Sequence, residues 1–309
     1  MVLAYPRPER FLSFGRSTVP TAAVPIEIRT RAESSDRFES TGEILPYLLD
    51  EAFIDVWALH WAMCGRYTIF MVDTDFEERF GAVPQGFLDP RYNAAPGQEL
   101  PVIRDDSPTE ITRLRWGLIP EWADEESTDF INARAETLGE KHSFAEPFEQ
   151  RRCLVLADGF YEWAETGEGK QPYRITTAKE EPFCIAGLWE RWTPPDAQSD
   201  LAAFADSGGD NAGSVGEPEP IETYTIVTTD ANEAVGDLHH RMPVVLPREE
   251  ERRWLEDDAE DVVDLLAPYP GGMQAYPVSR AVNDPSNDAP GVITEVDPES
   301  ETGTGAEAD

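Results

Sequence analysis

Side chains that can act as nucleophiles, acids and bases lie in four short motifs of this sequence. Cys64, Asn132, Glu162 and His239 each belong to one motif, and these residue types carry out nucleophilic and acid–base catalysis. The chain has only four histidines in 309 residues, so the adjacent pair His239 and His240 is unusual. The motifs are MCGRY (63–67), INARAET (131–137), GFYEW (159–163) and HHRMP (239–243).

Each of these residues, taken singly, also has a structural explanation. Cys64 could be a small buried hydrophobic residue, Asn132 a turn residue or a helix cap, and the two histidines packing or surface residues. Glu162 could be a carboxylate that faces water at the end of a strand. The set as a whole favours catalysis. Two aromatic residues flank Glu162, and burial among them would raise the pKa of its carboxyl group toward neutrality.

Short apolar runs between turn-rich segments predict the elements that position these side chains. A capping box at 74–77 predicts a helix that ends at Phe80, and residues 230–233 predict the cap of another helix. Pro247 is expected in the first turn of a helix over 248–255. Strands are predicted over 111–116, 153–157, 173–177, 183–189 and 224–229. This combination predicts an α+β fold around a mostly antiparallel sheet.

The composition is typical of a cytoplasmic protein from a salt-loaded, halophile-like cell. The net charge is −36, from 61 acidic and 25 basic residues, and only Lys141, Lys170 and Lys179 of the basic residues are lysines. Strong screening in such a cell lowers the cost of self-repulsion, and an acidic surface favours solubility. At 40% hydrophobic and 10% aromatic residues, the chain is too apolar for a disordered acidic protein.

The sequence also argues against several classes of protein. Its three cysteines, Cys64, Cys153 and Cys184, have no paired spacing, so we expect neither a disulfide framework nor a zinc site. No metal or other cofactor is expected. The chain has no apolar run long enough to cross a bilayer and no secretory pattern at its start. We therefore expect a cytoplasmic location without a membrane partner.

Three segments differ from the part that carries the motifs. Residues 1–62 have a net charge of −3, from six arginines and nine acidic residues. We interpret them as the product of a mis-set translation start, with a propeptide or a genuine extension as the alternatives. Residues 193–221 are rich in Pro, Gly, Asp and Ser and predict a flexible acidic insertion. Residues 285–309 predict an acidic disordered tail.

The motifs, in this order along the chain, resemble those of the SRAP family, the SOS-response-associated peptidases or abasic-site-processing proteins. The resemblance covers about residues 63–284. It implies a single α+β domain with a mostly antiparallel, β-barrel-like core, flanking helices and a positively charged groove. It also implies that the protein forms a covalent crosslink with single-stranded DNA containing abasic sites. We expect this DNA as the partner and a monomer as the state of the protein.

Matching the motifs assigns expected roles to individual residues. Cys64 corresponds to the crosslinking cysteine, and Asn132 to the residue that positions it. Glu162 corresponds to the catalytic carboxylate, and His239 to the catalytic histidine. The residues expected to contact DNA are Arg66 and Arg134 at phosphates, Trp116 and Trp122 along the DNA path, Pro96 as a wedge against the bases, and Arg241.

The expected chemistry requires Cys64 to be the first residue of the mature chain. An α-amine has a pKa of about 7.7–8.0 and can attack the aldehyde of an open abasic sugar to form an imine. The thiol on the same residue then closes a thiazolidine ring, and this second step is intramolecular. An internal Cys64 has an amide nitrogen, which cannot form the imine. We expect either translation from Met63 and removal of that methionine, or cleavage of residues 1–63, self-cleavage included.

Two other functions stay open from the sequence. Cysteine, histidine and asparagine also make a papain-like set, which would suit a peptidase acting on itself or on other proteins. A non-covalent reader of modified DNA could use the same groove. The charge of −36 opposes DNA binding in either case. We expect core arginines, base stacking of about 1–3 kcal/mol per base and the covalent bond to offset that repulsion.

Overall fold

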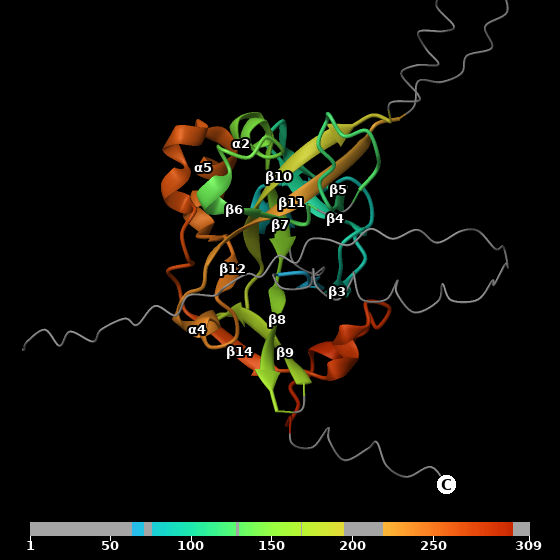
Figure 1. Cartoon of the computed structure of the whole chain (residues 1–309), viewed down its shortest axis with the longest axis vertical. Coiled ribbons are helices and arrows are strands. Elements are labelled where there is room, and N and C mark those ends of the chain that lie inside the picture. The colour runs from blue at the N-terminus through green and yellow to red at the C-terminus, as the bar shows by residue number, and fades with distance from the viewer. Residues whose placement is uncertain (1–63, 71–75, 128–129, 168, 195–218, 299–309) are drawn as a thin grey trace, which may run out of the picture. The chain divides into compact units, whose positions relative to one another are not determined.

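The computed structural model describes residues 64–70, 76–127, 130–167, 169–194 and 219–298. Strands dominate this part of the chain and form two sheets (Figure 1). The smaller sheet has the order β14 (Met273–Pro277), β9 (Gly169–Thr177), β8 (Gly159–Thr166), β1 (Tyr67–Ile69) and β3 (Arg91–Ala94). The larger sheet has the order β12 (Arg241–Pro243), β11 (Ile221–Asp230), β10 (Phe183–Trp192), β7 (Arg152–Ala157), β4 (Glu99–Arg104), β5 (Ser107–Trp116) and β2 (Val83–Pro84), with β13 (Val245–Leu246) beside β10 and β6 (Asn132–Arg134) beside β11.

Five strands of the larger sheet close into a barrel. β11, β10, β7, β4 and β5 are hydrogen-bonded in that order, and β5 then pairs with β11, so that Tyr224 lies opposite Trp116. This closing pair is parallel, whereas the other four pairs of the ring are antiparallel. Closure removes the unpaired edges that an open sheet would expose. The predicted α+β fold with a mostly antiparallel, barrel-like core is confirmed.

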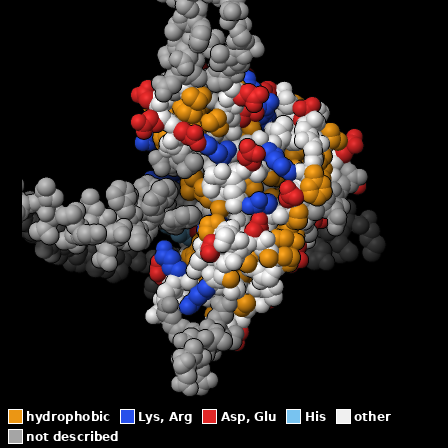
Figure 2. Space-filling view, turned by 90° about the vertical axis from the view of Figure 1, so that its right-hand side faces the viewer, with side chains coloured by type: hydrophobic (Ala, Val, Ile, Leu, Met, Phe, Trp, Pro, Cys, Tyr) orange, Lys and Arg blue, Asp and Glu red, His pale blue; other side chains and the backbone are white. Residues whose placement is uncertain are grey.

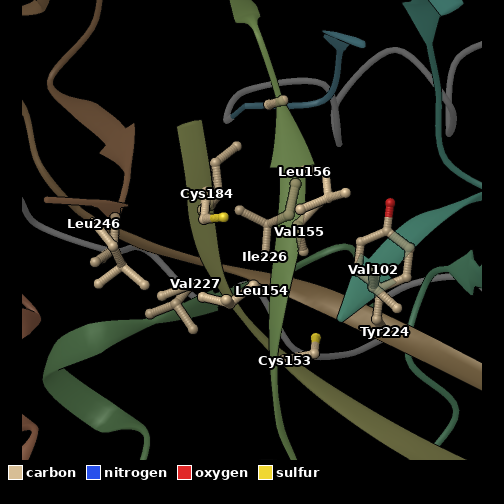
Figure 3. Close-up of a cluster of buried hydrophobic side chains, with 14 of the residues drawn as sticks. Val102, Cys153, Leu154, Val155, Leu156, Cys184, Tyr224, Ile226, Val227 and Leu246 are labelled. Carbon is tan, nitrogen blue, oxygen red and sulfur yellow. The ribbon is translucent and has the colours of Figure 1, made fainter. Parts of the chain in front are cut away.

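The barrel strands carry the hydrophobic core. β10 is buried at nine of its ten positions, which means that other parts of the chain cover both of its faces. Figure 3 shows side chains of β7, β10 and β11 packed together, with Cys153 and Cys184 among them. Both cysteines are buried free thiols, as is Cys64. The phenol groups of Tyr67 and Tyr224 share a hydrogen bond of 2.9 Å, which joins the smaller sheet to the barrel.

The chain passes from the barrel to the smaller sheet at Asp158, between β7 and β8. The Asp158 carboxylate accepts a hydrogen bond from the backbone N–H of Phe70 at 2.7 Å, and pairs with the Arg174 guanidinium at 3.1 Å. A Cβ atom on Gly159 would lie 2.8 Å from that guanidinium, so a larger residue here would displace Arg174 from Asp158. The buried ion pair therefore fixes β1, β8 and β9 relative to one another.

The helices in the described residues are short. The α-helices are α1 (Phe76–Phe80), α2 (Ala145–Gln150), α4 (Glu233–Gly236) and α5 (Glu251–Glu256). The 3-10 helices are η1 (Ala135–Thr137), η2 (Arg248–Glu250), η3 (Ala259–Asp261), η4 (Val263–Leu265), η5 (Arg280–Asn283) and η6 (Pro290–Ile293). None of the helices described is long and apolar enough to span a membrane.

All five predicted strands are present, whereas the helix predicted over 248–255 needs correction. The helix after β11 is capped by Asn232, whose side chain accepts the N–H of Val235 at 3.2 Å, within the predicted residues 230–233. The helix predicted over 248–255 is a 3-10 turn, η2, followed by α5, and Pro247 is the cap of η2 rather than a residue of its first turn. The capping box at 74–77 begins outside the described residues.

The segment after residue 285 is folded further than the sequence predicts. The Asp288 carboxylate accepts the backbone N–H groups of Tyr92 and Asn93 at 2.6 and 2.9 Å, and Val292 is buried in η6. These contacts correct the prediction of a disordered tail beginning at residue 285. Residues 299–309 and 1–62 lie outside the described residues. So do positions 195–218 of the insertion, which joins β10 to β11 as expected.

Candidate active site

Cys64 and Glu162 come together because β1 and β8 pair in antiparallel register. Tyr67 lies opposite Phe160 in this pair. Two residues further on, the same register sets Glu162 beside the Cys64–Gly65 segment. The Glu162 Oε1 atom accepts a hydrogen bond of 3.1 Å from the backbone nitrogen of Cys64.

Asn132 and His239 reach the same point from two other elements. β6 runs parallel to β11, and the Asn132 Nδ2 atom donates to the carbonyl oxygen of Cys64 at 3.4 Å. His239 lies between α4 and β12, and its Nδ1 atom is 4.0 Å from Glu162 Oε2. That distance exceeds a direct hydrogen bond. The structure thus brings together the four residues that the sequence nominates for catalysis, and their roles stay predictions.

Burial controls the protonation of Cys64 and Glu162. Glu162 is 3% exposed, and loss of hydration raises the pKa of its carboxyl group to about 7, although hydrogen bonds from Cys64 oppose this. Burial, and then the negative charge of Glu162, raise the pKa of the Cys64 thiol well above its usual value. A carboxyl group that can gain or lose a proton near neutral pH therefore lies beside a neutral thiol.

A pocket of about 410 Å³ opens over Cys64 and Glu162. Its volume falls within the usual range for small-molecule sites. The other residues that line it are Gly65, Arg66, Trp163, Lys170, Asn283 and Pro285. Asn283 and Pro285 belong to the folded C-terminal segment, which therefore forms one wall of the pocket. In the part of the chain that the structure describes, no cluster of three or more His, Cys, Asp or Glu side chains is placed to hold a metal ion.

Arg66 lies at the pocket, but its guanidinium is bonded to the protein itself. Arg66 is only 3% exposed. Its Nη1 atom donates to Asn93 Oδ1 and to the carbonyl oxygen of Val282, both at 2.8 Å, and Nη2 donates to the carbonyl oxygen of Asn283 at 3.1 Å. Arg66 therefore fastens the C-terminal wall of the pocket. Its predicted contact with a DNA phosphate would require these bonds to exchange.

Trp116 and Arg241, which were also predicted to contact DNA, are buried as well. Trp116 has no exposed surface, so it offers no face to a DNA base in this conformation. Arg241 is 7% exposed and pairs with Glu136 at 2.6 Å and with Asp230 at 3.0 Å. These contacts give Trp116 and Arg241 structural roles in the barrel and beside β11.

The remaining predicted DNA contacts lie at the surface. Arg134 is exposed at the end of β6. Trp122 is 54% exposed and stacks on His142 with ring centres 5.4 Å apart. Pro96 is half-buried in the turn between β3 and β4, where Gly97 has a φ of +84°. On the face shown in Figure 2, Lys and Arg side chains lie among Asp and Glu side chains, so this face carries positive as well as negative charges.

Sequence reasoning missed several residues that complete the site. Trp163 lies within the GFYEW motif and Lys170 is one of only three lysines, and both facts were available signals. Asn283 had no such signal, because a fold is needed to bring it to the pocket. The same holds for the pair of Asp158 and Arg174, whose contact depends on the register of β8 and β9.

The chain is similar to known proteins over the part that forms this site. The model of the family described as SOS response associated peptidase (SRAP) matches residues 63–285. The abasic site processing protein YoqW of Bacillus subtilis is 41% identical over 242 residues, which are 75% of this chain and 99% of that protein. The abasic site processing protein HMCES of Gallus gallus is 32% identical over 250 residues, 69% of this chain and 68% of that protein. A crystal structure of a protein from Bacteroides thetaiotaomicron superposes with a TM-score of 0.61 at 29% identity, over 75% of this chain and all of that one.

Proposed function

Because the chain belongs to the SOS response associated peptidase (SRAP) family, we propose that it recognises abasic sites in single-stranded DNA and crosslinks to them through Cys64. Its relatives YoqW and HMCES are named abasic site processing proteins. The observation that carries the proposal is the 3.1 Å hydrogen bond from the backbone nitrogen of Cys64 to Glu162. It sets the nitrogen and thiol of one residue beside a carboxyl group that can exchange protons near neutral pH.

The proposal requires the mature chain to begin at Cys64. In the full chain the Cys64 nitrogen belongs to a peptide bond, and its lone pair is not nucleophilic. Removal of residues 1–63 would convert the same atom into an α-amine beside Glu162. Translation from Met63 followed by methionine removal would give this chain. Hydrolysis of the peptide bond before Cys64 by the protein itself would give it too, and would account for a peptidase activity directed at its own chain.

The crosslink forms in two steps with one water released. The α-amine of Cys64 adds to the aldehyde carbon of the open abasic sugar, and the resulting carbinolamine loses its hydroxyl group as water to give an imine. The Cys64 sulfur then adds to the imine carbon, and the thiol proton passes to the nitrogen. The product is a thiazolidine that contains carbon, nitrogen and sulfur in one ring. Because amine and thiol share one residue, the second step gains from proximity.

Glu162 is the group placed to move protons in both steps. In its protonated form it can donate to the departing hydroxyl, and in its ionised form it can accept the proton of the thiol. His239, with Nδ1 at 4.0 Å from the carboxylate, can exchange protons with it when the two groups approach. Asn132 holds the carbonyl oxygen of Cys64 at 3.4 Å and so orients the attacking nitrogen. The same transfers in reverse, with one water taken up, would hydrolyse the thiazolidine and release the DNA. Any lyase-type chemistry at the abasic site would be a separate activity of the same pocket.

The geometry favours this chemistry over that of a peptidase with a thiolate nucleophile. Catalytic thiolates have a lowered pKa, usually beside a histidine. Here burial and Glu162 raise the pKa of the Cys64 thiol, and the backbone nitrogen of Cys64 donates a hydrogen bond to Glu162. The protein on this proposal acts as a monomer in the cytoplasm. The crosslink would shield an abasic site from strand cleavage and from error-prone copying.

A crosslinking assay with one substitution tests the proposal. A chain beginning at Cys64 should form a heat-stable adduct with single-stranded DNA that holds one abasic site. Cys64→Ser should lose that adduct while keeping non-covalent binding. Cys184→Ala is the matched control, because Cys184 is a buried thiol of the core, and it should react like the unaltered chain. Equal adduct yields with Cys64→Ser would refute the proposal, because another residue would then form the crosslink. Binding without an adduct from either chain would favour a non-covalent reader.

A further inference from the structure

Lys170 is a cation at the pocket that the chemistry above does not use. It lies on β9 opposite Glu165 of β8, and its Nζ atom is 3.5 Å from Glu165 Oε1. The two side chains are 55% and 76% exposed. An ion pair this exposed contributes about 0–1 kcal/mol, so another anion can readily replace Glu165 as the partner of Lys170.

Asn283, on the C-terminal wall of the same pocket, has a side-chain amide with two N–H donors. The indole Nε1 of Trp163 donates to Asn283 Oδ1 at 2.8 Å. An indole N–H can only donate, so the amide oxygen must face Trp163 and the amide NH2 must face away from it. The Asn283 backbone is held by Arg66, whose Nη2 donates to its carbonyl oxygen at 3.1 Å. The orientation of this amide is thereby fixed at the pocket.

The other cation of the pocket is already engaged. Both terminal nitrogens of Arg66 donate to the chain itself, at 2.8 to 3.1 Å. Among the residues that line the pocket, Lys170 is therefore the cation whose charged group is exposed to an incoming ligand. An ammonium group and an amide NH2 on two residues that line the same pocket match the acceptors of a phosphodiester, which offers only oxygen acceptors and a negative charge.

We propose that Lys170 and Asn283 form a phosphate-binding subsite that holds the DNA phosphate next to the abasic sugar. This inference rests on the proposed function, because it supposes that the sugar enters the pocket over Cys64. The subsite positions one flanking phosphate, and through it the sugar, at the Cys64 nitrogen. Trp163 is a positioning residue, because it acts by orienting the Asn283 amide.

Non-covalent binding tests the subsite separately from the crosslink. The probe is a single-stranded oligonucleotide with one tetrahydrofuran residue, which has no aldehyde and cannot react. Its affinity for the full chain is measured by fluorescence anisotropy at several KCl concentrations. Lys170→Ala should weaken binding about fivefold and lower the slope of log affinity against log salt by about 0.7. Lys179→Ala is the matched control, an exposed lysine outside this pocket, and should leave both values unchanged.

A neutral linkage then identifies the phosphate. Two further probes carry a methylphosphonate on one side or the other of the tetrahydrofuran residue. The penalty of Lys170→Ala should disappear on one of them and persist on the other. Asn283→Asp, which replaces donors by a negative charge, should weaken binding about tenfold on the charged probe, more than Asn283→Ala, and should recover on the same methylphosphonate probe.

Two outcomes would overturn the subsite. One is wild-type affinity of Lys170→Ala on the charged probe. The other is an equal penalty on all three probes, which would mean that Lys170 acts only through the general field of the protein. Failure of the proposed function looks different. The full chain would bind the tetrahydrofuran probe and show the Lys170→Ala effect, but the chain that begins at Cys64 would form no adduct with an aldehydic abasic site.

Discussion

Replacing Glu162 with glutamine should stabilise the folded protein above neutral pH. Burial raises the pKa of the carboxyl group to about 7 from an ordinary value of 4.5. Below pH 4.5 the Glu162 carboxyl group is protonated in both the folded and the unfolded state, so its ionisation does not lower the free energy of unfolding. As the pH rises toward the upper value, the unfolded state loses its proton first, so ionisation favours unfolding. Because one pKa unit corresponds to about 1.4 kcal/mol, the full effect is about 3 kcal/mol.

Urea unfolding across a pH series measures this effect. The wild-type chain and Glu162→Gln are compared from about pH 4 to about pH 8.5, at one fixed KCl concentration. Glutamine keeps an oxygen that can accept the Cys64 N–H. The difference in free energy of unfolding should be small at the acidic end, grow in favour of Glu162→Gln up to about pH 7, and then level off. The control Glu165→Gln, on the same strand with a side chain 76% exposed, should show no such growth. A difference that does not change with pH would refute the assignment of a buried, proton-exchanging carboxyl group at position 162.

Three further outcomes are expected. Arg174→Ala should lower the free energy of unfolding by about 3–5 kcal/mol, because it removes the guanidinium that neutralises the Asp158 carboxylate, whose side chain is only 1% exposed; a free energy of unfolding within about 1 kcal/mol of wild type, roughly the value of an exposed pair, would contradict the buried network. In the chain that begins at Cys64, the α-ammonium should hold the pKa of Glu162 below its value in the full chain. NMR titration of both chains measures this pKa, and an equal value in the two would exclude contact between the α-ammonium and Glu162. His239→Gln should slow crosslinking about 100-fold with little change in affinity for the tetrahydrofuran probe, and an unchanged single-turnover rate would remove His239 from the chemistry.

Local patterns were sufficient to predict β5, β7, β10 and β11 of the barrel, but not β4, and to find the motifs that carry the candidate site residues. β7 and β10 are runs of apolar residues buried nearly throughout, so their hydrophobicity alone indicates strands. Cys64, Asn132, Glu162 and His239 were found because their residue types and motifs are informative without a fold. Their convergence followed from the resemblance to a family and not from any spacing in the sequence.

The features that the sequence left undetermined depend on contacts distant along the chain. The strand β8, which carries Glu162, ends in exposed polar residues and gains its order by pairing with β1 and β9. The acidic composition after residue 285 predicts disorder, yet Asp288 and Val292 tie that segment to β3 and the smaller core cluster. The bonds of Arg66 to residues 282 and 283 follow from that docking, and no local pattern indicates them.

The intact mass of the protein purified from its own host tests the central claim most directly. The mass is measured before and after incubation with single-stranded DNA that holds one abasic site. We predict a chain that begins at Cys64, and a heat-stable product whose mass is the sum of protein and DNA less one water. A chain that retains residues 1–63 and forms the same product, or a chain that begins at Cys64 and forms none, would contradict the mechanism proposed for Cys64 and Glu162.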